Sequence, residues 1–220
     1  MKIVWQKSRD LIDRRRGTIG GIAAVLAAVV AFLLGRQQVQ EPDPDEDLVY
    51  LVSTALDRGQ DFWQTRIPNY RRAKVVLYTK STSTRCGRGI ATSGPFYCPG
   101  DERIYLDLAF LRAFGSDFAR AYVIAHELGH HVQKILGRIP GMRPVAEAEL
   151  EADCLAGMWM RHEQTAGTLD AGDVSAAIET AASVGDDRLL PGSSPETWNH
   201  GSAEQRADAV RTGLSDRCPL

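Results

Sequence analysis

The sequence has almost no net charge, no internal repeat and no strong compositional bias. Its 26 Lys and Arg residues against 28 Asp and Glu residues leave a charge of −2 over 220 residues. A nucleic-acid-binding domain is strongly basic, so no nucleic-acid partner is expected. Hydrophobic residues make up 44% of the chain and charged residues 25%, which excludes general disorder and a fibrous protein.

Cysteine is scarce, and no two cysteines have the CxxC spacing. The four are Cys86, Cys98, Cys154 and Cys218. Without a CxxC pair, a structural zinc site of four thiolates is not expected. Cys86 and Cys98 bracket a Gly-containing stretch typical of a bent loop or hairpin, so we predict that they form a disulfide. Cys154 then remains for Cys218, although Cys154 lies in a predicted helix, where a buried free thiol is the alternative.

The first 47 residues distribute their charge unevenly around a long apolar run. Residues 1–36 carry a balance of +5, and residues 37–47 carry −5. Residues 17–35 contain no charge, and as a helix they span about 28 Å, close to the hydrocarbon thickness of a bilayer. A cleavable signal peptide is the alternative, but its apolar region is shorter and precedes a small-x-small cleavage site. We therefore predict an uncleaved transmembrane anchor at residues 17–35.

These features divide the chain into four parts. A basic cytoplasmic head is predicted at residues 1–16, before the anchor, and an acidic, Pro-containing linker at residues 36–47 after it. Residues 48–220 then form one folded domain. Because basic residues flank the cytoplasmic end of a membrane span, we expect a single-pass protein with its N-terminus in the cytoplasm and this domain outside it. The lipid bilayer is thus an expected partner, through residues 17–35.

The folded domain is predicted to be α+β and dominated by helices, with a small sheet near its N-terminal end. Residues with β-branched and aromatic side chains or with alternating polarity predict strands at 73–79, near 95–98 and at 103–107. Helical periodicity begins near residue 48 and recurs later in the chain. The later helices are expected at about 117–136, 145–166, 171–184 and 202–213.

The segment Ala125-His126-Glu127-Leu128-Gly129-His130 carries the main chemical signal. On a helix, residues four apart lie on one face, so His126 and His130 can direct both imidazoles at one Zn²⁺. Glu127 lies on the adjoining edge, where its carboxylate could reach a metal-bound water without binding the metal.

A third ligand is available in the segment Glu149-Leu-Glu-Ala-Asp153, which begins 19 residues after His130. Glu149 and Asp153 share one helix face. A catalytic zinc site has three protein ligands and an open position, and its histidines need an acceptor that fixes their tautomer. Glu149 as the third ligand and Asp153 as that acceptor meet both needs. A solvated acidic helix face is the alternative interpretation.

Several separated segments together resemble the predicted bacterial neutral zinc metallopeptidases, which are membrane-anchored zincins of the glutamate-zincin type. They are HELGHHVQ (126–133), ELEADCLAG (149–157), GPFYCP (94–99), GDDRL (185–189) and HGSAEQR (200–206). The resemblance implies a zincin-like domain in a bacterial cell envelope. It also implies that His126, His130 and Glu149 ligate zinc, that Glu127 is the general base, and that Asp153 orients His126.

The segment HGSAEQR contributes two further candidates, His200 and Arg206. Amide hydrolysis builds negative charge on the carbonyl oxygen, and a positioned donor stabilises that charge. Similar zincins supply a His or Arg from a late segment, so both residues are candidate catalytic groups. The alternative is a helix N-cap with Arg206 in a surface ion pair.

The sequence therefore predicts a membrane-anchored, zinc-dependent endopeptidase that binds one Zn²⁺ per chain and hydrolyses a peptide or protein substrate. A metal-activated water would attack the peptide bond, with Glu127 as the general base. The alternative function is a non-catalytic, zinc-stabilised binding module tethered to the membrane. Glu127 argues against it, because a structural metal site has no use for a carboxylate aimed at an open coordination position.

Overall fold

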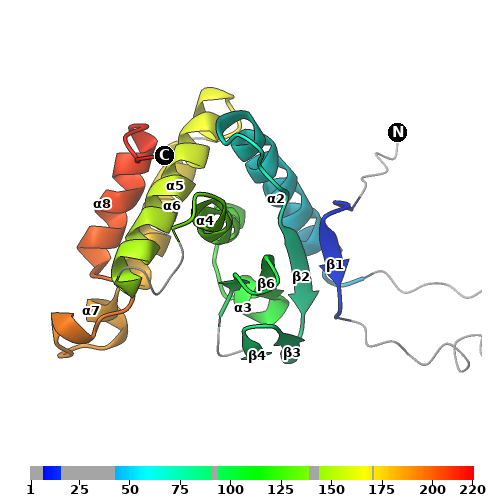
Figure 1. Cartoon of the computed structure of the whole chain (residues 1–220), viewed down its shortest axis with the longest axis horizontal. Helices are drawn as coiled ribbons and strands as arrows, with labels where there is room; N and C mark the ends of the chain where they lie inside the picture. Colours follow the sequence, from blue (N-terminus) through cyan, green and yellow to red (C-terminus); the bar gives the residue numbers. More distant parts are fainter. Residues whose placement is uncertain (1–6, 16–42, 91–93, 139–143, 170) are drawn as a thin grey trace, which may run out of the picture.

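The computed structural model describes residues 7–15, 43–90, 94–138, 144–169 and 171–220. The predicted transmembrane anchor at residues 17–35 lies outside these residues. Among the residues that the structure does describe, no helix has the length and apolar character needed to cross a membrane. The described chain forms a helix-rich α+β fold with two small sheets (Figure 1).

The larger sheet has the strand order β1-β2-β6-β5. Its strands are β1 (Leu11–Asp13), β2 (Lys74–Tyr78), β5 (Phe96–Cys98) and β6 (Arg103–Asp107). β1, β2 and β6 run parallel, and β5 pairs antiparallel with β6. The strands predicted at 73–79, near 95–98 and at 103–107 are thus confirmed as β2, β5 and β6.

Side chains alternate between the two faces of this sheet, as the pleat requires. Val75 and Leu77 of β2 belong to the main core, whereas Val76 and Tyr78 belong to a second, small cluster on the opposite face. A hairpin of β3 (Ser81–Thr84) and β4 (Gly87–Ile90) lies against that second face, where the Tyr78 hydroxyl donates to the Ile90 carbonyl oxygen at 3.4 Å. Ser, Thr and Gly dominate these two strands, so no strand was predicted here from β-branched or alternating residues.

Helices form the rest of the domain. They are α2 (Glu46–Arg66), α3 (Leu108–Arg112), α4 (Asp117–Ile135), α5 (Val145–Thr165), α6 (Ala171–Ser183), α7 (Asp186–Leu189) and α8 (Ala203–Leu214), with a 3-10 turn at Pro195–Thr197. α4 lies in the centre, between α2 on one side and α5 and α6 on the other (Figure 1). The predicted helices of the C-terminal half are confirmed to within about two residues at each end.

A glycine of the HExxH segment sets how closely α5 approaches α4. A Cβ atom added at Gly129 would lie 2.9 Å from the carbonyl oxygen and 3.0 Å from the Cα atom of Ala152. Backbone atoms cannot move aside easily, so only glycine permits this crossing. The contact point on α5 lies between Glu149 and Asp153, and it therefore brings both carboxylates to the histidines of α4.

The contact between α5 and α8 is equally close and is closed by a disulfide. Gly157 and Gly213 face each other's helix backbone, which explains why the interior of α5 contains a glycine. Cys154 and Cys218 are bonded beside this crossing, and Cys86 is bonded to Cys98 between the hairpin and β5. Both predicted pairings are confirmed.

Residues 7–15, which belong to the predicted N-terminal head, pack against the folded domain. β1 pairs with β2, and Arg15 forms ion pairs with Asp43 at 2.7 Å and Asp45 at 2.9 Å. A chain that crossed a bilayer once between residues 16 and 42 would separate β1 from β2. The pairing of β1 and the predicted single crossing therefore exclude each other.

The end of the predicted linker at residues 36–47 also belongs to the domain. Asp45 is buried, and α2 begins at Glu46, two residues before the boundary expected at residue 48. Two acidic residues of that linker, Glu46 and Asp47, lie in the first turn of α2, where the helix dipole favours negative charge.

Candidate metal centre

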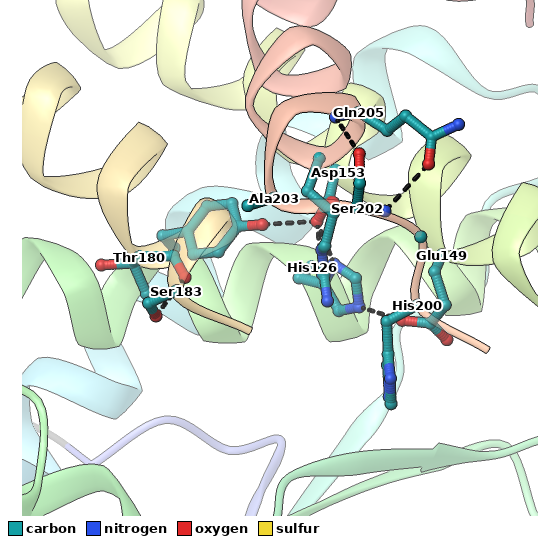
Figure 2. A network of polar contacts seen from close by, with 12 residues as sticks. His126, Glu149, Asp153, Thr180, Ser183, His200, Ser202, Ala203 and Gln205 are labelled. Atoms are coloured by element: carbon teal, nitrogen blue, oxygen red, sulfur yellow. Dashed lines mark hydrogen bonds and ion pairs between the residues drawn. The ribbon is translucent and has the colours of Figure 1, made fainter. Parts of the chain in front are cut away.

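Three side chains from α4 and α5 converge at the centre of the domain. Glu149 places one carboxylate oxygen 3.1 Å from Nε2 of His126 and the other 3.3 Å from Nε2 of His130. The ligand atoms of the three residues lie within 4.8 Å of one another. Figure 2 shows His126 between Glu149 and Asp153, which come from successive turns of α5. The two pairs predicted from i, i+4 spacing, His126 with His130 and Glu149 with Asp153, thus contact each other across the α4–α5 interface.

The other nitrogen of each imidazole is held by a protein acceptor. Nδ1 of His126 donates to Asp153 at 2.7 Å, and Nδ1 of His130 donates to the Gln133 side-chain oxygen at 2.9 Å. Gln133 is itself fixed, because its amide nitrogen donates to the Ala148 carbonyl oxygen at 2.6 Å. Both imidazoles therefore present Nε2 toward Glu149, as ligation of a common metal ion requires.

Asp153 is fully buried and accepts hydrogen bonds from three side chains. Besides His126, these are the Tyr122 hydroxyl and Arg206, whose Nε and Nη2 atoms donate at 2.8 and 2.9 Å. Arg206 is 3% exposed, so the surface ion pair considered from the sequence is wrong. Its bidentate contact with Asp153 fits a positioning role better than the predicted role as a donor to substrate.

Glu127 lies beside the ligand cluster and is one of the residues that line a cavity. Its side chain is buried, and its Oε2 atom has no hydrogen-bond partner among the described residues. Burial raises the pKa of this carboxyl group. An unpartnered buried carboxylate oxygen is costly for folding, which indicates that its position serves a ligand, a water or a reaction.

The electrostatics of the site favour one added positive charge. Burial alone would lower the pKa of His126, but Asp153 and Glu149 raise it to about 10. Burial disfavours the charged form of Glu149, yet the two histidines hold the pKa of that carboxyl below its usual range. A divalent cation bound by both Nε2 atoms and Glu149 would replace the imidazole protons and satisfy the same carboxylates. Two imidazoles and one carboxylate are ligands that zinc accepts in catalytic sites, so the residues fit this ion.

His200 reaches the same cavity from the segment before α8. Asp186, at the first position of α7, accepts from Nδ1 of His200 at 3.0 Å and from its backbone nitrogen at 2.6 Å. Asp186 thus occupies Nδ1 of His200, and His200 lines the cavity together with Glu127 and Glu149. Ser202 and Gln205 then form a capping box that starts α8 (Figure 2).

The cavity has a volume of about 360 Å³. Its polar lining consists of the residues just described, namely Tyr122, His126, Glu127, Glu149, His200 and Arg206, together with Thr180. The structure therefore brings every site residue predicted from the sequence to one place, either in the cavity wall or, for His130 and Asp153, directly behind it.

Sequence reasoning missed Tyr122, Gln133 and Asp186. Gln133 lies three residues after His130 on the same helix, so helical spacing could have revealed it. Asp186 lies in the segment GDDRL (185–189), and nothing in its local sequence pairs it with His200. His131, the neighbour of His130, is buried and held by the Tyr97 hydroxyl and the Arg71 carbonyl oxygen, so it takes no part in the ligand cluster.

Comparison with known proteins identifies the class to which this domain belongs. Residues 33–219 match the family described as "Putative neutral zinc metallopeptidase", so the chain belongs to that family. The resemblance read from the sequence motifs is confirmed at this level.

The chain is also similar to two bacterial proteins. It is 37% identical over 213 residues to the uncharacterized protein YpfJ of Escherichia coli strain K12, covering 84% of this chain and 74% of that protein. It is 36% identical over 186 residues to the uncharacterized protein Rv2575 of Mycobacterium tuberculosis strain H37Rv, covering 71% and 64%. No solved structure matches.

Proposed function

We propose that this protein is a zinc-dependent endopeptidase of the glutamate-zincin type, with one Zn²⁺ per chain held by His126, His130 and Glu149. One observation supports this proposal above all. The three ligand atoms lie within 4.8 Å of one another, and Glu127, which has a buried, unpartnered carboxylate oxygen, lines the cavity together with His126 and Glu149. A structural zinc site is closed by four protein ligands, whereas a catalytic site keeps one position open.

A zinc ion in this site would polarise a peptide carbonyl group and lower the pKa of a water molecule. Glu127 accepts the proton of the attacking water at Oε2 and then donates it to the leaving amine. Asp153 keeps His126 in the tautomer that presents Nε2, and Arg206 and Tyr122 hold Asp153 in place. Gln133 does the same for His130.

In its imidazolium form, in which Nδ1 donates to Asp186, His200 donates from Nε2 to the carbonyl oxygen as negative charge develops there. Its ring is held by Asp186 through Nδ1, so the orientation of this donor is fixed before substrate binds. Arg206 acts through Asp153 and is a positioning residue. This division of roles replaces the prediction that both His200 and Arg206 contact the substrate.

Substituting Glu127→Gln separates a peptidase from a zinc-stabilised binding module. The variant should bind one zinc per chain and lose hydrolysis of an unfolded protein substrate by a factor on the order of 10² or more. Glu147→Gln is the matched control, because Glu147 is exposed in the first turn of α5 and should leave both properties unchanged. Full hydrolysis by the Glu127→Gln variant would remove Glu127 from its role. Zinc binding without hydrolysis in the unaltered protein would favour the binding module.

We also propose that the domain works outside the cytoplasm, in a bacterial cell envelope, attached to the bilayer through residues 17–35. Because β1 pairs with β2, residues 7–15 would then lie on the same side of the membrane as the domain. The two disulfides support this location, since disulfides persist in oxidising compartments. Alkylation of thiols in protein taken from intact cells should find all four cysteines oxidised.

A further inference from the structure

Cationic side chains gather around the β3–β4 hairpin, which lies on the face of the sheet opposite the main core. They come from the residue after β1, from the turns that precede and join β3 and β4, from β4 itself and from the start of β6. We call them the basic patch: Arg14, Lys80, Arg85, Arg88 and Arg103. Arg103 is half-buried and the others are exposed. The proposed chemistry uses none of these residues, and the sequence motifs gave none of them a role.

Contacts within the hairpin bring members of the basic patch together. Nη1 of Arg14 donates to the Thr82 hydroxyl oxygen at 3.4 Å, and Nη2 of Arg88 donates to the Ser81 hydroxyl oxygen at 3.2 Å. Thr82 and Ser81 are neighbours in β3, so these two guanidinium groups reach the same strand from β1 and from β4. Figure 1 shows the hairpin next to the end of β2, beside which β1 also ends.

Arg85 and Arg103 line a polar depression on this face, with a volume of about 450 Å³. Hydroxyl groups of β3 and of Tyr105 also line it. Asp101 is the carboxylate among the described lining residues, and its Oδ2 atom accepts from the Tyr105 hydroxyl at 2.7 Å and from the Arg85 backbone nitrogen at 3.4 Å. Two guanidinium groups beside hydroxyl groups are donors that suit the oxygens of a phosphate group.

The positive charge of the basic patch is not balanced within the domain. Most arginines elsewhere in the described chain lie against a carboxylate, as Arg72 does with Asp10 at 2.5 Å. Among the described residues, no Asp or Glu side chain forms an ion pair with a member of the patch. Glu102, which precedes Arg103, pairs with Arg71 at 3.1 Å instead. An unbalanced cluster of cations attracts an anionic partner.

The segment that we propose to attach the chain to the bilayer leaves the domain beside this patch. Arg15, which follows the patch residue Arg14, pairs with Asp43 at 2.7 Å, so residues 16–42 begin and end at one place on the domain. The uncharged run 17–35 begins two residues after Arg15. Two residues span at most about 7 Å, which is less than the Debye length of about 8 Å at physiological ionic strength. A bilayer that holds residues 17–35 therefore has its headgroups within electrostatic reach of Arg14 and of the hairpin beside it.

We infer that the basic patch binds the headgroups of anionic phospholipids in the bilayer to which the chain is attached. This inference rests on the proposed attachment through residues 17–35 and not on the peptidase activity. Each Lys or Arg held near an anionic membrane surface raises the affinity by about fivefold. Ile90, at the end of β4, is 44% exposed and adds an apolar side chain beside these cations. The domain thus contacts the membrane through the hairpin.

The experiment compares two bilayers and uses the full-length protein. The protein is reconstituted into vesicles of phosphatidylcholine alone, or of an equal mixture of phosphatidylcholine and phosphatidylglycerol. Arginine side chains are modified with phenylglyoxal, which is uncharged, and the rate at each site is read by mass spectrometry. Arg85 and Arg88 should react at least roughly fivefold more slowly in the anionic vesicles, and high salt should remove the difference. Arg161, exposed near the end of α5, should react equally in both.

Charge reversal at two exposed positions tests the patch as a unit. Arg85→Glu combined with Arg88→Glu should raise the reaction rate of Arg103 in anionic vesicles to its rate in phosphatidylcholine. The matched control is Arg161→Glu combined with Arg217→Glu, which should leave Arg103 protected, since both positions are exposed and lie outside the patch. Because every substituted side chain is exposed, both variants should unfold at the temperature of the unaltered protein, which verifies their fold.

Flotation with the vesicles separates this inference from the proposed attachment. Flotation with both bilayers and equal rates at Arg85 and Arg88 would overturn the inference and leave the attachment intact. Salt-sensitive flotation with the anionic vesicles alone would support the patch and overturn the attachment. No flotation with either bilayer would overturn both. Protection of Arg85 by inorganic phosphate without anionic lipid would assign the patch to a small anion and overturn the inference.

Discussion

Arg206 of α8 donates two parallel hydrogen bonds to the carboxylate of Asp153 of α5, and both side chains are buried. The burial of each ion would be unfavourable without the other. The Arg206 guanidinium and His126 overcome the effect of burial and hold the pKa of Asp153 below its usual range. This pair ties the last helix of the chain to a histidine of the metal centre, since Asp153 also accepts from Nδ1 of His126.

Removing Arg206 should therefore damage the metal centre rather than the reaction alone. Arg206→Ala leaves Asp153 buried without its cation, and we expect a loss of about 3–5 kcal/mol in the free energy of unfolding. Zinc affinity should fall roughly 10- to 100-fold, because Asp153 no longer holds His126 firmly. Urea denaturation and competition with a zinc chelator measure both effects. A variant with normal stability and zinc affinity but a lowered kcat would instead restore the predicted role as a donor to substrate.

Gly129→Ala tests whether the close crossing of α4 and α5 builds the ligand set. The added methyl group would meet the backbone of Ala152, so α5 must move away from α4. Overpacking of this kind costs about 1–3 kcal/mol of stability. We also expect zinc affinity to fall by roughly tenfold or more as Glu149 moves with α5.

The matched control for this substitution is Gly115→Ala, since a Cβ atom at Gly115 meets nothing within 4 Å. Isothermal titration with zinc compares the two variants. Equal zinc affinity in both would show that Glu149 reaches the histidines without help from the glycine crossing.

His200 and Asp186 should differ in how strongly their substitution lowers turnover. His200→Ala removes the proposed donor to the carbonyl oxygen, and we expect kcat to fall on the order of 10²-fold with zinc content unchanged. Asp186→Asn keeps an acceptor for Nδ1 but loses its charge, so kcat should fall less and KM should change little. His162→Ala, an exposed position on α5, is the control. A change in KM alone for His200→Ala would assign this residue to substrate binding.

The ligand set could be predicted from the sequence because its geometry is local. His126 and His130, like Glu149 and Asp153, are spaced by one helical turn, and only the meeting of the two helices is a tertiary property. Gln133 follows the same rule. The four cysteines paired as predicted because Cys86 and Cys98 bracket a short hairpin, which leaves one remaining combination.

The remaining features depend on contacts between distant segments. Asp186 reaches His200 across 14 residues with no regular spacing, and the apolar residues that line the cavity come from separate segments between Pro95 and Leu189. β1 has only three residues, in a segment dominated by charges, so it carries no alternation that would mark a strand. Its pairing depends on the exposed edge of β2 and on the cations that surround Asp10.

Asp10 is the residue that holds this N-terminal strand against the domain. It is buried, and it accepts from Arg72 at 2.5 Å and from Lys74 at 2.6 Å. Burial opposes ionisation, but these two cations hold the pKa of Asp10 below its usual range. The stabilisation is therefore present above about pH 4, the value for an unfolded Asp, and is lost as the pH falls through the lower folded value. Asp10→Asn should reduce stability at pH 7 by about 1–3 kcal/mol and weaken its decline in acid.

The docking of Asp10 also predicts the membrane topology. If residues 7–15 stay paired with β2 in the cell, tags at the N-terminus and the C-terminus must lie on the same side of the membrane. Protease added to spheroplasts should then digest both tags in the unaltered protein, and lysed cells give the control for complete digestion. Protection of the N-terminal tag alone would instead support the predicted topology, in which residues 17–35 cross the membrane once. In that case Asp10→Asn would leave the stability of the membrane-bound protein unchanged, because β1 and β2 would never meet.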